Sequence, residues 1–214
     1  MAKRSLSTGN LYQKVFKLFD FEGFWADVFG QPERGGFWLI WGKEKNGKTW
    51  IALLLAYYLS TKGKTLYISA EEGIGKEFVD TCKRIGLDPA NRNLQFWEYE
   101  PIEDLEKRLA KRNSEEIVFI DNVTVYNEEL KSGKLEQLRL RFPQKTFIFL
   151  AHEDRKEPYT ATAKMIKRLA KIIIYAEGLA GIVSGRCPGG RLVIDEEKAC
   201  LYHGTEIINQ NKEE

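Results

Sequence analysis

GKEKNGKT, residues 42–49, fits the pattern G-x-x-x-x-G-K-[ST] and stands between two apolar segments. FWLIW (37–41), before it, has the length of a buried strand, and TWIALLLAYYLSTKG (49–63), after it, is apolar on nearly every side, as a buried helix is. In such a strand–loop–helix unit the N–H groups of the loop and the positive end of the helix converge on phosphate oxygens. The motif therefore predicts a binding site for a nucleoside triphosphate, and we expect ATP.

Two side chains of the loop suit this task. Lys48 is expected to reach the β- and γ-phosphates. The Thr49 hydroxyl is expected to hold Mg²⁺, a hard cation that prefers oxygen ligands. The predicted nucleotide contacts are Gly42, Lys43, Glu44, Lys45, Asn46, Gly47, Lys48, Thr49 and Trp50.

Carboxylates end two other apolar runs. Asp121 closes EIVFID (116–121), and the apolar residues directly before it favour a role in orienting a magnesium-bound water over a role as a turn residue. Glu71 and Glu72 follow TLYISA (65–70). Because ligands of open α/β sheets bind beyond the carboxyl ends of strands, we expect Glu71 to activate the attacking water and Glu72 to support it.

The rest of the chain alternates strand and helix patterns. Continuous apolar runs such as TFIFLA (146–151) are expected where helices cover both faces of a parallel sheet. After a short basic helix at 163–171, closely spaced strands separated by turn residues predict an antiparallel hairpin extension. The sequence thus predicts an α/β fold, a mostly parallel twisted sheet with helices on both faces. The other predicted elements are helices at 76–87 and 102–113 and strands at 94–99, 172–177, 181–186, 191–195 and 199–204.

Composition excludes several classes of protein. The 214 residues carry 33 Lys and Arg against 31 Asp and Glu, so any basic surface must come from local clustering. There are three cysteines, Cys82, Cys187 and Cys200. Their odd number, their wide spacing and the lack of a C-x-x-C pair argue against a disulfide framework and against a zinc site. The amino-terminal residues lack the apolar run of a secretory signal, and no stretch is apolar enough to span a membrane. We expect a soluble cytoplasmic protein.

The chain divides into three parts by pattern. Residues 1–34 are polar and aromatic by turns and predict a short helix and an irregular lead-in, either packed on the core or docked on a neighbouring subunit. Residues 35–208 form a single nucleotide-binding domain, and 209–214 are expected to fray.

Four stretches together resemble the RecA-like superfamily of recombinases and helicases. They are GKEKNGKT (42–49), YISAEEG (67–73), FIDNVTVY (119–126) and FIFLAHEDRKEPYTATAKMIKRLAKIIIYAEG (147–178). The closest likeness is to the ATPase core of the RadA/Sms DNA-repair proteins, without room for their zinc finger or protease-like domain. The resemblance spans roughly residues 20–185 and implies a magnesium-dependent ATPase that assembles as a ring or filament.

The resemblance also implies roles for individual residues. Glu71 matches the catalytic glutamate, and His152 matches the polar residue that senses the γ-phosphate. Arg186 falls near a basic motif that reaches the nucleotide of the neighbouring subunit, although Ser184 replaces the lysine of that motif. The segments 123–134 and 153–164 occupy the places of the two DNA-facing loops. Their basic residues, expected to contact DNA phosphates, are Lys131, Lys134, Arg155, Lys156 and Lys164.

Two functions remain open at this stage. The first is a DNA-dependent ATPase of recombination, repair or replication that couples its ATP state to single-stranded DNA binding. The second is a regulatory or assembly ATPase in the sense of KaiC, which acts on protein partners and whose basic loops are merely solvated. A small-molecule kinase is less favoured, because the pair of glutamates at a strand end indicates water as the acceptor.

Overall fold

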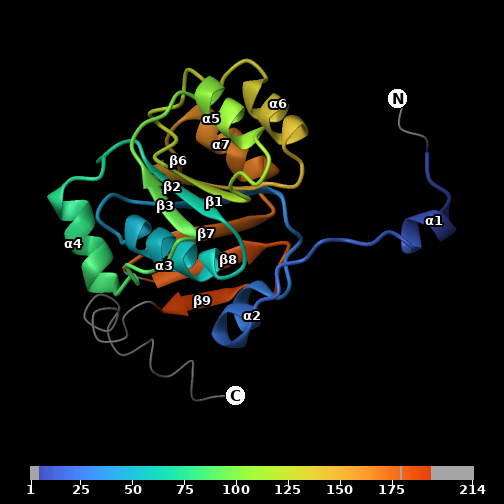
Figure 1. Ribbon diagram of the computed structural model, residues 1–214, viewed down its shortest axis with the longest axis horizontal. Helices are drawn as coiled ribbons and strands as arrows, with labels where there is room; N and C mark the ends of the chain where they lie inside the picture. Colours follow the sequence, from blue (N-terminus) through green and yellow to red (C-terminus); the bar gives the residue numbers. More distant parts are fainter. Residues whose placement is uncertain (1–4, 179, 194–214) are drawn as a thin grey trace.

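The computed structural model describes residues 5–178 and 180–193 and is built on one large mixed sheet (Figure 1). Its strand order is β3-β2-β4-β5-β1-β7-β8-β9, with β6 paired to the end of β5. The strands are β1 (Gly36–Gly42), β2 (Thr65–Ser69), β3 (Leu94–Trp97), β4 (Ile117–Asp121), β5 (Thr146–Asp154), β6 (Glu157–Pro158), β7 (Ile172–Glu177), β8 (Ala180–Gly185) and β9 (Gly190–Val193).

The six strands from β3 to β7 in this order run parallel, and β8 and β9 continue the sheet antiparallel. This arrangement confirms the predicted mostly parallel sheet and its antiparallel extension. Parallel strands place all their carboxyl ends at one edge, so the residues that follow β1, β2, β4 and β5 meet there.

Helices cover both faces of the sheet (Figure 1). The core on one face includes α3 and the amino-terminal aromatic residues, and the core on the other includes α5, α6 and α7. The helices are α1 (Thr8–Tyr12), α2 (Gly23–Phe29), α3 (Lys48–Ser60), α4 (Lys76–Ile85), α5 (Ile102–Leu109), α6 (Lys134–Arg141) and α7 (Ala161–Leu169).

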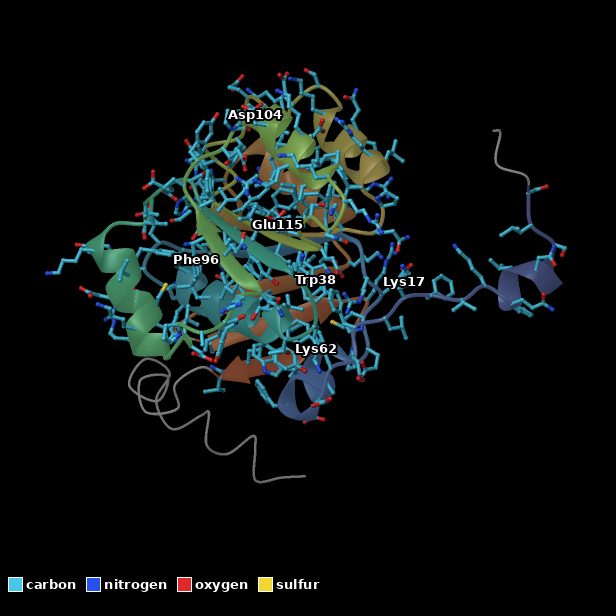
Figure 2. All side chains as sticks on the ribbon, in the orientation of Figure 1. Lys17, Trp38, Lys62, Phe96, Asp104 and Glu115 are labelled. Carbon is cyan, nitrogen blue, oxygen red and sulfur yellow. The ribbon has the colours of Figure 1, made fainter. Side chains whose placement is uncertain are left out.

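The central strands are buried on both faces because each face has its own helical layer. Trp38 on β1 (Figure 2) is fully buried. Its ring packs edge-on against Phe19 and is stacked on Phe29, with 5.7 Å between the Trp38 and Phe29 ring centroids. Helix α3 has buried residues on most of its circumference, as its apolar sequence predicts. This burial fixes the start of α3, and with it the loop at residues 42–49.

The sequence-based expectation left two parts of the chain undetermined. Helix α6 was not predicted, because its strongly charged sequence buries only Leu135 and Leu138. For the lead-in, the sequence left open packing on the core or docking on a neighbouring subunit. Phe19, Phe21, Val28 and Phe29 are buried in the core, whereas Leu11, Val15 and Phe16 are exposed. Before Lys17 the chain leaves the body of the protein, and α1 has no buried residue (Figure 1).

Some predictions fall beyond the described residues. These are the strand at 199–204, the end of the strand at 191–195, Cys200 and the tail at 209–214. Cys82 and Cys187 are free, partly buried thiols. In the part of the chain that the structure describes, no helix is long and apolar enough to cross a membrane.

Candidate nucleotide-binding site

The carboxyl ends of four neighbouring strands assemble one cleft. Across the sheet, Glu71 follows β2, Asp121 ends β4, His152 lies on β5, and the loop at 42–49 follows β1. The backbone register sets Gly42 beside His152 and Ser69 beside Asp121. The cleft has a volume of about 590 Å³, within the usual range for small-molecule sites.

The loop at 42–49 has the backbone that a phosphate cradle needs. Gly47 adopts the left-handed conformation (φ 83°) directly before the first residue of α3. A Cβ atom at Gly42 would stand 2.3 Å from the carbonyl oxygen of Ala176 on β7, so only glycine fits between the two strands. The predicted contacts that line the cleft are Glu44, Lys45, Gly47, Lys48, Thr49 and Trp50.

Lys48 is held in the cleft by its own loop. Its side chain is buried, and its Nζ donates to the carbonyl oxygen of Lys43 at 2.7 Å. Burial lowers the pKa of Lys48 below its usual value, and the nearby carboxylates of Asp121 and Glu71 oppose this shift. A buried ammonium group whose partner is a neutral carbonyl is suited to an anionic ligand.

Thr49 and Asp121 form the predicted magnesium position. The Thr49 hydroxyl lies 3.4 Å from Asp121 Oδ2, and the same oxygen accepts a 2.7 Å hydrogen bond from the buried Tyr67 hydroxyl. Desolvation raises the pKa of Asp121 to about 6, although the bond from Tyr67 opposes the rise. A carboxylate and a hydroxyl are the oxygen donors that Mg²⁺ prefers, so these two residues fit the ion. Within residues 5–178 and 180–193 there is no cluster of three His, Cys, Asp or Glu side chains that could hold a metal by itself.

Glu71 is fixed by two partners beside this position. Asn122 Nδ2 donates to Glu71 Oε2 at 2.8 Å, and His152 Nε2 lies 3.1 Å from both carboxylate oxygens. Asn122 is itself buried, and its Oδ1 accepts the N–H of Thr124. The carboxylate is therefore oriented across the cleft from the phosphate cradle, as a group that positions a water must be.

Glu72 lies differently from its neighbour. Both glutamates are exposed and line the cleft, but Glu72 also lines the adjoining hollow toward α4, and Glu71 does not. The geometry therefore favours Glu71 over Glu72 as the group that orients a water.

Sequence reasoning missed Asn122 and Tyr67 as members of the site. Asn122 could have been suspected from the sequence, because it is a polar residue directly after Asp121 at the end of a strand. Tyr67 lies inside an apolar strand, where an aromatic residue indicates core, and only the strand register brings its hydroxyl to Asp121.

The predicted DNA-facing segments lie next to each other on one surface. Thr162 Oγ1 donates to Asn127 Oδ1 at 2.8 Å, and this bond joins the two segments. Lys131 is paired with Glu128, whereas Arg155 and Lys156 form the tip of the β5–β6 hairpin. Lys134 and Lys164 lie on the first turns of α6 and α7.

Arg186 is not brought to the cleft of its own chain. It follows β8, and its N–H donates to the carbonyl oxygen of Lys171 at 2.7 Å. Because β8 runs antiparallel to β7, this position is at the opposite edge of the sheet from the loop at 42–49. Arg186 could therefore meet a nucleotide only on another subunit.

Comparisons with known proteins support the fold. No protein-family model matches the chain, and no curated protein matches it. Among solved structures, the flagellar accessory protein FlaH from Methanocaldococcus jannaschii matches with a TM-score of 0.59 at 17% identity, over 82% of this chain and 91% of that chain. At this identity the likeness shows the fold alone. Together with the sheet order and the glycine-rich loop, it identifies a RecA-like P-loop fold, and nothing in it singles out the RadA proteins.

Proposed function

We propose that the chain binds and hydrolyses ATP with Mg²⁺ and couples its ATP state to single-stranded DNA, as a protein of recombination, repair or replication. The observation that carries the proposal is the fixed carboxylate of Glu71, which Asn122 and His152 hold across the cleft from Lys48 and Thr49. A carboxylate in that place is suited to a water nucleophile rather than to an alcohol of a second substrate.

Each residue then has a distinct task in hydrolysis. The amides of residues 42–49 and Lys48 bind and neutralise the phosphates, and Glu71 orients the attacking water and takes its proton. The Thr49 hydroxyl and the Asp121 carboxylate would hold Mg²⁺, which neutralises charge on the phosphate oxygens when bound. His152 contacts Glu71 and lies on the strand that leads into the β5–β6 hairpin, so it can report the state of the cleft to that hairpin.

The DNA role is supported by the position of the basic segments. Segments 123–134 and 153–164 follow β4 and β5, the two strands that carry Asp121 and His152. A change at either strand end therefore has a short path to Lys131 or Arg155. For assembly we propose a ring or filament in which Arg186 of one subunit approaches the nucleotide of the next.

ATP turnover with and without single-stranded DNA tests this function. We expect stimulation by DNA that weakens as salt rises, because phosphate contacts release counterions. Lys48→Ala should abolish turnover at every DNA concentration. Turnover retained in Lys48→Ala would refute the phosphate cradle, and turnover that DNA does not change at low salt would refute the DNA role alone.

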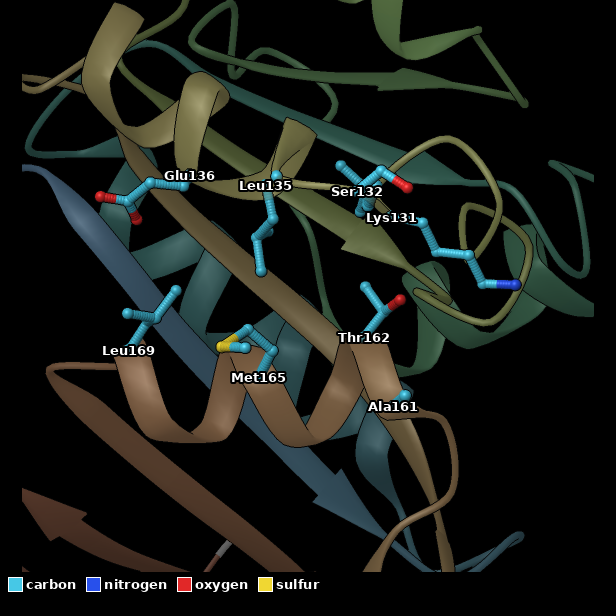
Figure 3. Close-up of a pocket in the computed structure, with 10 residues that line it drawn as sticks. Lys131, Ser132, Leu135, Glu136, Ala161, Thr162, Met165 and Leu169 are labelled. Atoms are coloured by element: carbon cyan, nitrogen blue, oxygen red, sulfur yellow. The ribbon is translucent and has the colours of Figure 1, made fainter.

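A second candidate is a regulatory or assembly ATPase that acts on a protein partner. A groove of about 410 Å³ lies between α6 and α7, on the same surface as the basic segments. Apolar side chains, Leu135, Met165 and Leu169 among them, face one another across it (Figure 3). An apolar groove suits a protein side chain better than a phosphate. The fold neighbour FlaH is described as a flagellar accessory protein, which is consistent with this alternative.

The substitution Met165→Arg separates the two candidates. It adds a cation at a half-exposed position and fills the groove. If DNA is the partner, its affinity should stay the same or increase, because a further positive charge favours phosphate contacts. If the partner is instead a protein that docks in the groove, the wild-type chain should not bind DNA at low salt. Met165→Arg should then weaken binding of the protein partner and leave ATP binding unchanged.

A further inference from the structure

The cleft extends beyond the phosphate cradle in one direction. At one end it is lined by the loop at 42–49, Asp121 and His152, and at the other by Thr81 and Arg84 of α4. Trp50, the third residue of α3, also lines the cleft and contacts Arg84. A further hollow of about 500 Å³ adjoins this second end and shares Thr81 and Arg84 with it.

Charge sets which part of a nucleotide each end can take. The first end holds the buried ammonium group of Lys48 and the amides at the start of α3, which attract phosphates. The α4 end is rimmed by the carboxylates of Glu72, Glu77 and Asp80. These carboxylates repel a polyphosphate and can accept hydrogen bonds from ribose hydroxyls or from an exocyclic amino group. The uncharged part of a nucleotide is therefore directed toward α4.

Trp50 offers this end a flat surface. Among the described residues that line the cleft, it alone provides a large aromatic face. The guanidinium carbon of Arg84 lies 5.8 Å from the centre of the Trp50 ring, and Arg84 Nη2 donates to Thr81 Oγ1 at 2.9 Å. The hydrogen bond to Thr81 holds the planar guanidinium group near the indole. Planar guanidinium and indole groups both stack on nucleobases.

We propose that Trp50 and Arg84 form the nucleobase subsite, in which the base stacks on the indole and the guanidinium group closes over it. The inference rests on the proposed nucleotide function and assigns the end of the cleft where the base lies.

Calorimetric titration of the full chain with Mg·ATP and with Mg·tripolyphosphate tests the subsite, because the second ligand has phosphates but no base. Trp50→Ala should weaken ATP binding about tenfold, as expected for a lost stacking contact, and change tripolyphosphate binding less than about twofold. Trp50→Phe should restore most of the ATP affinity. Arg84 is exposed, so Arg84→Ala should fold normally and weaken ATP binding a few-fold.

Lys83→Ala is the matched control, because it removes a neighbouring exposed charge of α4 that does not line the cleft. Its ATP affinity should equal that of the wild type. Unchanged ATP binding in both Trp50→Ala and Arg84→Ala, or equal weakening of both ligands, would overturn the nucleobase subsite and leave the phosphate cradle intact. A wild-type chain that binds neither ligand would remove the phosphate cradle and the subsite together.

Discussion

Glu71 and Glu72 are adjacent in sequence, yet the structure gives them different surroundings. Glu71 is held by Asn122 and His152, while Glu72 lines the hollow toward α4. We expect Glu71→Gln to keep ATP binding and to slow hydrolysis about 100-fold or more, the effect of a lost general base. Glu72→Gln is the matched control, with less than about a fivefold loss expected. Single-turnover hydrolysis and ATP binding should be measured on both, and a larger loss in Glu72→Gln would reverse the assignment.

Asp121 makes the unliganded protein less stable at neutral pH than it would be without the charge. Because desolvation raises the pKa of the folded-state carboxyl to about 6, the folded chain takes up a proton more readily than the unfolded chain. The resulting cost is absent below about pH 4, grows between about pH 4 and 6, and is constant above the folded-state pKa. The group is partly exposed to solvent, so the cost is on the order of 1 kcal/mol.

Asp121→Asn should therefore raise the melting temperature of the nucleotide-free chain at pH 8 by about 2–4 °C and leave it unchanged at pH 4. Tyr67 can still donate to the amide oxygen, so the core contact is kept. The same variant should lose magnesium-dependent ATP binding. Thermal unfolding at the two pH values measures the effect, and a variant less stable than the wild type at pH 8 would show that the Tyr67–Asp121 bond outweighs desolvation.

The β5–β6 hairpin is strained at its tip. Strand residues Asp154 and Glu157 pair with each other, so Arg155 and Lys156 form a two-residue turn, and both have positive φ (49° and 64°). Turns of this kind favour Asn-Gly, because branched or long side chains cost about 1 kcal/mol or more in the left-handed region. The two cations are thus kept at a cost in stability, on the surface that the DNA proposal assigns to phosphate contacts.

Replacing the turn by Asn-Gly, in the double variant Arg155→Asn/Lys156→Gly, should raise the melting temperature by about 2–4 °C. If this hairpin binds DNA, affinity should fall, and the slope of log affinity against log salt should decrease by about two. Lys111→Gly/Arg112→Asn removes two exposed cations from the turn after α5 and should leave DNA binding unchanged. A double hairpin variant with wild-type DNA affinity would exclude the hairpin from the interface.

Local sequence was sufficient where one strand end determined the chemistry. The P-loop was predicted from its motif between two apolar segments, and Asp121 and Glu71 from their places at the ends of apolar strands. The alternation of strands and helices predicted the parallel sheet. The Tyr67–Asp121 and Asn122–Glu71 bonds were not predictable, since they depend on the pairing of β2 with β4. Helix α6 was missed because its charged sequence buries only Leu135 and Leu138, and β6 because its two residues pair only with the end of β5 across a tight turn.

The molecule as a whole consists of a compact sheet with its helices and one separate arm. Residues 5–16 extend away from the body and include α1, whereas Lys17 and Leu18 already contact Arg34 and Glu33 (Figure 1). Large apolar side chains of this arm are exposed, with Val15 at 91% and Phe16 at 49%. The sequence left open whether this segment packs on its own core or docks on a neighbouring subunit, and the exposed side chains of the arm are available to a second copy of the chain.

This arrangement makes a prediction about assembly. If the arm joins subunits, Val15→Glu/Phe16→Glu should shift the nucleotide-bound protein from oligomer to monomer, because two buried carboxylates without partners are costly at an interface. Melting temperature and ATP affinity of the single chain should not change, since the two side chains contribute nothing to its core. Light scattering coupled to size-exclusion chromatography, with a non-hydrolysable ATP analogue, measures the mass.

Leu140→Glu is a suitable control for the assembly experiment, because Leu140 is also an exposed apolar residue (66%) but lies on α6 of the body. Its mass should equal that of the wild type. A wild-type chain that stays monomeric with the analogue would argue against the ring or filament, and with it against a role for Arg186 on the next subunit. An oligomer unaffected by Val15→Glu/Phe16→Glu would instead keep the assembly and move its contacts to the body, where Arg186 lies.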